Sequence, residues 1–92
     1  MSMKPEQIYE HLMDVAAKLN IKVKEKNLDT LGLHAKSGFC KIKGEQVFIM
    51  DKKKSIHKKN DLLASCLGNI QHDHIYIIPA IRELLNTYKD PL

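Results

Sequence analysis

The chain has 92 residues, a formal net charge of +4 at pH 7, 43% hydrophobic residues and 28% charged residues. This length allows a single domain, residues 1–92, and the composition is globular rather than disordered. No apolar run approaches the roughly 20 residues of a membrane span, and the N-terminal residues lack a secretory signal. We therefore expect a cytoplasmic protein without membrane contact, whose two cysteines are reduced thiols.

The N-terminal third predicts a helix followed by a strand. Pro5 suits the first turn of a helix, and apolar residues then recur at helical spacing as far as Leu19. From Ile21 the period changes to an alternation of apolar residues and lysines, which predicts a half-buried strand. A second alternation over residues 31–35 predicts a further strand.

The clearest β signal predicts a hairpin. Its strands are Phe39–Lys43 and Gln46–Met50, and the chain turns at Lys43-Gly44-Glu45, where glycine supplies the positive φ of a tight turn. The second strand is apolar on both faces, so we expect it to be central and the most buried strand.

Two helices are expected in the C-terminal part of the chain. Ser55 can cap the first, whose apolar stripe ends near Gly68 and Asn69. A connector with His72 and His74 leads to the second helix, which Pro79 opens. The predicted class is α+β: an N-terminal helix, a three- or four-stranded mainly antiparallel sheet, and two C-terminal helices packed against it.

The helical segment Leu63–Ile70 reads LASCLGNI, which has the pattern L-A-x-x-L-G-x-I. With the hairpin and the capping serine before it, this segment resembles the ImmA/IrrE-like metallopeptidases, whose corresponding helix reads L-A-H-E-L-G-H-I. In that family the two histidines bind zinc and the glutamate is the general base. The residues at these positions here are Ser65, Cys66 and Asn69. The resemblance thus implies a peptidase frame without its ligands, and we expect no catalytic residues, no cofactor and no metal.

Packing alone also explains this helix, with Ser65 and Asn69 on its polar face. The residues Gly38, Cys40, Lys41 and Gly44 of the hairpin, together with the ending Pro79–Leu84, also resemble small bacterial proteins. That second likeness implies no function.

Lysines cluster around the start of the second helix, and they are Lys52, Lys53, Lys54, Lys58 and Lys59. Such a cluster can bind nucleic acid or an acidic protein, or it can be a solvated loop and helix start. No aromatic residue stands among these lysines to stack on bases. Binding of nucleic acid is therefore an alternative hypothesis.

A second alternative is an enzyme with an unrecognised site near Cys40 and Cys66, with Lys41 and Arg82 as further members. Against it, Cys66 lies on the apolar stripe near a helix C-terminus, and Cys40 shares a strand face with Ile42. Both positions favour inert thiols in the core over activated ones.

The histidines give a further candidate site. His72 and His74 could share a metal with a third ligand such as His57. No residue of the sequence identifies that third ligand, and we expect exposed connector histidines instead.

The favoured interpretation is a non-enzymatic interaction or regulatory module with an unidentified protein partner. Because a small core leaves apolar surface uncovered, we also expect a symmetric homodimer. The last helix is the predicted interface, with Leu85 and Tyr88 facing the partner and Arg82 at the rim. In the alternative, the apolar residues of this helix all pack inside one chain.

Overall fold

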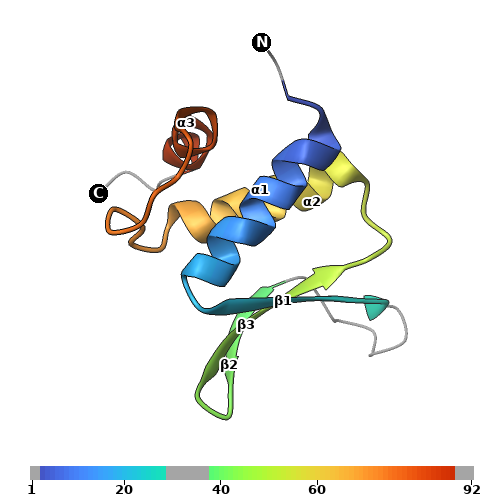
Figure 1. Ribbon diagram of the computed structural model, residues 1–92. Helices are drawn as coiled ribbons and strands as arrows, with labels where there is room; N and C mark the ends of the chain where they lie inside the picture. The colour runs from blue at the N-terminus through green and yellow to red at the C-terminus, as the bar shows by residue number, and fades with distance from the viewer. Residues whose placement is uncertain (1–2, 29–37, 89–92) are drawn as a thin grey trace.

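The computed structural model describes residues 3–28 and 38–88. Its elements, in chain order, are α1 (Pro5–Lys18), β1 (Ile21–Lys26), β2 (Gly38–Ile42), β3 (Glu45–Asp51), α2 (Ile56–Gly68) and α3 (Pro79–Thr87) (Figure 1). The α+β class is confirmed, as are the N-terminal helix, the hairpin and the two C-terminal helices. The strand predicted over residues 31–35 lies outside the described residues.

The described strands form one mixed sheet in the order β1-β3-β2. β3 pairs antiparallel with β2 and parallel with β1, from Ile21 opposite Gln46 to Lys26 opposite Asp51. The sheet is therefore mixed rather than mainly antiparallel. Alternation in a sequence predicts that a strand exists but not which neighbour it takes, and β1 pairs with β3 rather than with β2, the next described strand.

The hairpin turn consists of Lys43 and Gly44, with φ values of 53° and 83°. Positive φ at both central residues is the pattern of a type I′ turn, whose twist matches that of the flanking strands. Glu45 already belongs to β3 and pairs with Ile42 across the turn. The predicted hairpin is confirmed.

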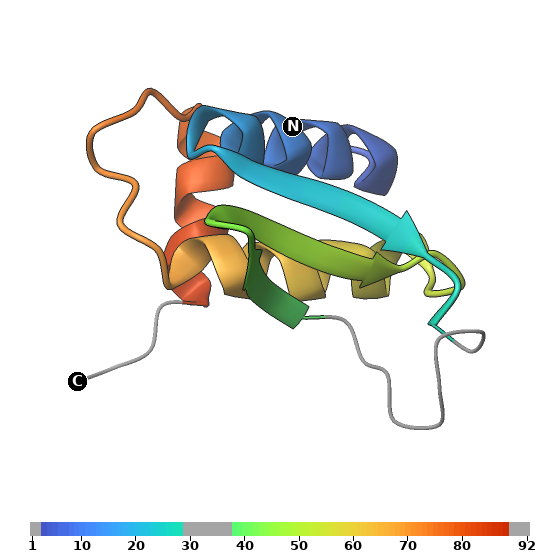
Figure 2. The same cartoon turned by 90° about the horizontal axis from the view of Figure 1, so that it is seen from below.

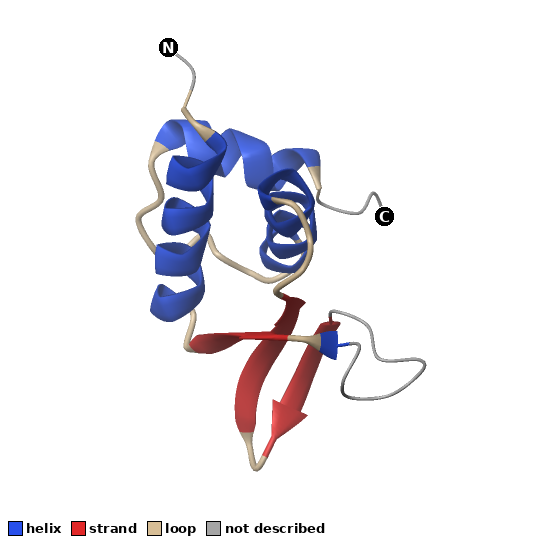
Figure 3. Cartoon of the chain, turned by 90° about the vertical axis from the view of Figure 1, so that its right-hand side faces the viewer, coloured by secondary structure: helices blue, strands red, loops and turns tan. Residues whose placement is uncertain are grey.

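The helices cover one face of the sheet. α1 and α2 lie between the sheet and α3 (Figure 1), and the view along the other axis shows the helices on one side and the strands on the other (Figure 3). From below, the sheet lies in front of α1 and α2, and α3 crosses them at one end (Figure 2). We had predicted that both C-terminal helices pack on the sheet, but α3 packs on the helices.

The core lies between the sheet and the helices, and β3 is confirmed as its central strand. Val47, Phe48 and Met50 of β3 are at most 4% exposed. Phe48 and Met50 belong to the core cluster, together with side chains from all three helices and β1. Because side chains alternate along a strand, Val47 points to the opposite, outer face of the sheet.

Two features, one at each end of the helix, position α2. The Ser55 hydroxyl accepts a hydrogen bond from the backbone N–H of Lys58 at 3.2 Å, which confirms the predicted cap. At the other end, a β-carbon on Gly68 would lie 2.6 Å from the backbone oxygen of Leu85. The missing side chain therefore lets α3 approach α2 closely. None of the helices described here is long and apolar enough to span a membrane.

Candidate functional site

A groove of about 440 Å³ lies between β2 and α2, on the helix side of the sheet. We call it the β2–α2 groove, and its lining residues are Phe39, Phe48, Leu62, Ser65, Cys66, Asn69 and Ile70. Phe39 is 44% exposed, so an aromatic ring on one wall of the groove is open to solvent. An accessible concave apolar surface of this kind is a candidate binding site.

The two walls of the groove follow from the periods of a strand and a helix. Phe39 and Phe48 are paired across β2 and β3, so both rings lie on the helix side of the sheet. On α2, Leu62, Cys66 and Asn69 are spaced by four and three residues and lie along one side of the helix. Leu63 and Leu67 are fully buried and belong to the core cluster instead.

The groove is lined by the three residues that replace the zinc ligands and the general base of the peptidase pattern, Ser65, Cys66 and Asn69. The Asn69 amide donates hydrogen bonds to the backbone oxygens of Ser65 at 2.9 Å and Tyr88 at 3.2 Å. Burial raises the pKa of the Cys66 thiol to about 11, so this thiol is protonated at neutral pH. A neutral thiol, a hydroxyl and an amide engaged with backbone oxygens are poorly suited to hold zinc.

The structure does not bring the two cysteines into one site. Cys40 pairs with Val47 and lies on the outer face of the sheet, whereas Cys66 lines the groove on the helix side. The guanidinium of Arg82 donates to the backbone oxygen of Ile75 at 3.0 Å and lies 3.8 Å from the Asp73 carboxylate. The two cysteines therefore lie on opposite faces of the sheet, and Arg82 contacts the connector that precedes α3.

The histidines are not grouped either. His74 and His57 are exposed, but His72 is only 6% exposed, so the prediction that it is exposed was wrong. Its Nδ1 lies 2.7 Å from the backbone oxygen of Ile70, two residues earlier in the chain. Within residues 3–28 and 38–88, no three His, Cys, Asp or Glu side chains are close enough to share a metal ion.

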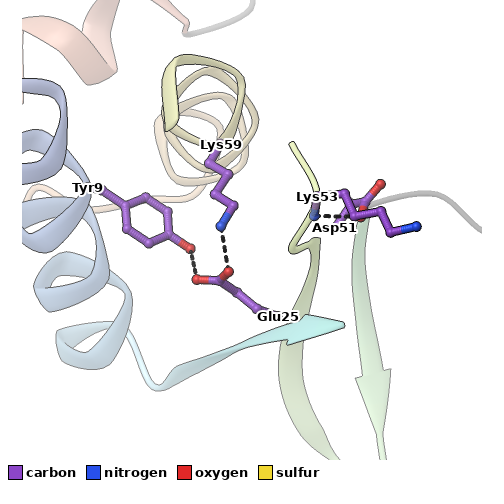
Figure 4. Close-up of polar contacts among 5 residues, drawn as sticks. All are labelled: Tyr9, Glu25, Asp51, Lys53 and Lys59. Atoms are coloured by element: carbon purple, nitrogen blue, oxygen red, sulfur yellow. Dashed lines mark hydrogen bonds and ion pairs between the residues drawn. The ribbon is translucent and has the colours of Figure 1, made fainter. Parts of the chain in front are cut away.

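Lys59 does not belong to the predicted basic cluster. Its ammonium lies 2.6 Å from the Glu25 carboxylate, which also accepts a hydrogen bond from the Tyr9 hydroxyl at 2.9 Å (Figure 4). The bond to Lys59 lowers the pKa of Glu25, and burial together with the bond to Glu25 raises the pKa of Tyr9. These three side chains join α2, β1 and α1, and their role is structural.

The other predicted lysines, Lys52, Lys53, Lys54 and Lys58, are exposed. Sequence reasoning missed two neighbours, Lys24 and Lys26 of β1, which are also exposed. The backbone N–H of Lys52 donates to the oxygen of Lys26 at 3.0 Å, which brings the end of β1 beside the β3–α2 loop. We call Lys24, Lys26, Lys52, Lys53 and Lys54 the basic surface. The alternation of lysines from Lys22 to Lys26 was the signal that could have revealed it.

The predicted dimer surface on α3 needs correction. Leu85 is 0% exposed and Ile81 is 1% exposed, so Leu85 cannot face a partner. The close approach at Gly68 draws α3 onto α2 and places Leu85 in the core. The Tyr88 hydroxyl donates a hydrogen bond to the Asp61 carboxylate on α2, and this bond raises the pKa of Tyr88.

A larger hollow of about 780 Å³ lies between α1 and β1. Its lining includes Met13 and Val23, but also Lys22, Lys24 and Glu45. Lys22 and Glu45 form an exposed ion pair at 3.0 Å across this hollow. None of the predicted site residues lines it, so the smaller β2–α2 groove remains the candidate site.

Comparison of the chain with models of known protein families, with curated proteins and with solved structures finds no significant match. The resemblance to ImmA/IrrE-like metallopeptidases therefore stays a prediction.

Proposed function

We propose that the protein is a non-enzymatic interaction module that binds an apolar segment of a partner protein in the β2–α2 groove. The observation that carries the proposal is the half-exposed Phe39 ring beside a groove wall formed by Leu62 and Cys66. Ser65, Cys66 and Asn69 stand where the peptidase pattern has its zinc ligands and general base. Their chemistry supports a degenerate peptidase-like frame that binds without hydrolysis.

The charges around the groove support an acidic partner segment. No Asp or Glu is among the described residues that line the groove. Lys41 lies on the same face of β2 as Phe39, and Lys58 lies one turn before Leu62 on α2. The carboxylate of Asp61, the nearby acidic residue on α2, already accepts a hydrogen bond from the Tyr88 hydroxyl. The proposed occupant is thus a bulky apolar side chain flanked by acidic residues.

Selection from a library of short random peptides tests this specificity on the purified protein. We expect the enriched peptides to carry a bulky apolar residue with Asp or Glu beside it. Ser65→Glu fills the exposed rim of the groove, adds a charge that repels acidic peptides, and should weaken their binding about tenfold or more, which is about 1.4 kcal/mol. Asn86→Glu, on an exposed position of α3, is the matched control and should bind like the wild type. Equal losses in both variants, or no enrichment, would contradict the proposal.

The proposal also places the module in the cytoplasm, where Cys40 and Cys66 remain thiols. There it acts as a homodimer. The interface proposed for this dimer is the edge of β2 rather than α3, since Leu85 of α3 is buried.

Binding of nucleic acid is a second candidate function, which the contact between Lys26 and Lys52 favours. This contact brings the basic surface together from two separate segments of the chain. Fluorescence anisotropy with labelled duplex DNA and with single-stranded RNA at increasing salt tests it. If the lysines bind phosphates, the logarithm of the association constant should fall linearly with the logarithm of the salt concentration. The slope should be smaller in the double variant Lys26→Gln/Lys52→Gln. Affinity that is independent of salt would exclude this function.

A further inference from the structure

We infer that two copies of the chain pair through the edge of β2 that no described strand occupies, antiparallel and with Cys40 at the two-fold axis, so that their sheets become continuous. The inference deepens the homodimer of the proposed function. It does not require the β2–α2 groove to bind a partner.

Strand β2 lies at the edge of the sheet, and its only neighbour among the described strands is β3. It also carries two of the three large apolar side chains that are exposed in the described part of the chain, Phe39 at 44% and Ile42 at 45%. These side chains lie on opposite faces, because Phe39 shares the face of Phe48 whereas Ile42 shares the face of Cys40. An edge strand with apolar side chains on both faces is a template for pairing with another chain.

The hairpin determines which backbone groups of β2 are available. Ile42 and Glu45 close a two-residue turn, so they form a hydrogen-bonded pair. Hydrogen-bonded and non-hydrogen-bonded pairs alternate along an antiparallel ladder, so Cys40 also bonds toward β3. The N–H and C=O groups of Phe39 and Lys41 consequently point away from β3.

Only one two-fold register uses these outward groups well. With the axis at Cys40, Phe39 of each copy exchanges both backbone hydrogen bonds with Lys41 of the other copy. An axis at Lys41 would place two lysines directly opposite each other, which is destabilising. An axis at Phe39 would place Lys41 opposite a residue beyond the start of β2. The register centred on Cys40 therefore fits the strand best.

The side chains are complementary in this register. The Lys41 ammonium of one copy lies beside the half-exposed Phe39 ring of the other, a favourable pairing of a cation with an aromatic ring. On the outer face, Ile42 of one copy lies opposite Gly38 of the other, where no side chain competes for the space. Each of the two exposed apolar side chains of β2 thus gains a neighbour from the other copy in the same pairing.

Disulfide trapping tests the register. At the axis, two Cys40 residues form a non-hydrogen-bonded pair with α-carbons about 4.5 Å apart, which a disulfide can bridge. We expect the Cys66→Ser variant, which keeps Cys40, to become a covalent dimer when oxidised with copper-phenanthroline. The control is Ile42→Cys in a Cys40→Ser/Cys66→Ser background. Residue 42 is exposed on the same face as Cys40, but the two residues 42 of the dimer would lie about 14 Å apart along the strands.

Light scattering without oxidant completes the test. We expect a mass about twice the 10.6 kDa of one chain at micromolar concentration. Lys41→Pro removes an outward N–H and should give a folded monomer with unchanged circular dichroism, because an edge position tolerates proline. A monomeric mass for the wild type, or cross-linking of Ile42→Cys as fast as that of Cys40, would overturn the inference. Ser65→Glu should remain dimeric, so failure of the groove and failure of the dimer are distinguishable.

Discussion

Lys59 and Glu25 form an ion pair of 2.6 Å although they are 34 positions apart in the sequence. The lysine side chain is only 15% exposed and the carboxylate 36% exposed, so water screens the pair incompletely. The pair joins the first turns of α2 to the end of β1, and the Tyr9 hydroxyl adds α1 to the same contact. One carboxylate therefore holds three elements of the fold together.

Glu25→Gln should lower the free energy of unfolding by about 1 kcal/mol at neutral pH, a value already reduced for the partial exposure of the carboxylate. The pKa of Glu25 is lowered in the folded state. Its contribution is therefore present above the ordinary carboxyl pKa and is lost as the pH falls through the lowered pKa. Urea unfolding across the acidic range should show a shallower loss of stability for Glu25→Gln than for the wild type. Parallel pH profiles of the two proteins would contradict this.

Tyr9→Phe removes the hydroxyl that donates to Glu25 at 2.9 Å and should cost about 0.5–1.5 kcal/mol of stability. Because both changes affect one carboxylate, the double variant Tyr9→Phe/Glu25→Gln should lose less than the sum of the single losses. Urea unfolding of the four proteins measures this coupling. Strict additivity would mean that the Tyr9–Glu25 hydrogen bond contributes nothing to stability.

Gly68→Ala should destabilise the protein, although alanine normally favours a helix over glycine by about 1 kcal/mol. The added β-carbon would lie 2.6 Å from the backbone oxygen of Leu85, so α3 must shift away from α2. Overpacking of this kind typically costs about 1–3 kcal/mol. Thermal unfolding should show a lower melting temperature for Gly68→Ala. Ser65→Ala, an exposed position one turn earlier on α2, should melt at or above the wild-type temperature.

Features with local causes were predictable from the sequence. The hairpin follows from Gly44 and the apolar run of β3, and the start of α2 follows from Ser55. The position of β1 beside β3 was not predictable, because alternation does not encode which neighbour a strand takes. The burial of Leu85 also depends on a contact between two helices at Gly68, which a helical period does not reveal.

The candidate site was likewise predictable only in part. Leu62, Cys66 and Asn69 lie on one side of α2, as their spacing requires. The opposite wall depends on the register of β2 against β3, which places Phe39 beside Phe48. The ion pair of Lys59 with Glu25, which removes Lys59 from the basic cluster, is likewise a contact between distant segments. Such contacts depend on tertiary packing, which short-range patterns do not report.

Cys66 should react slowly with thiol reagents in the folded protein. Burial raises the pKa of this thiol to about 11, so little of the reactive thiolate is present at neutral pH. In a Cys40→Ser background, the rate of alkylation by iodoacetamide should rise through mildly alkaline pH toward about 11. In the protein unfolded by urea, the pKa of the Cys66 thiol should be near the ordinary cysteine value, about 8.5.

Since the folded pKa is the higher one, the contribution of Cys66 to stability is fully present below the unfolded pKa and is lost as the pH rises from that value toward about 11. Mass spectrometry gives the rates, and equal rates for the folded and unfolded protein at mildly alkaline pH would show that Cys66 is an accessible, ordinary thiol.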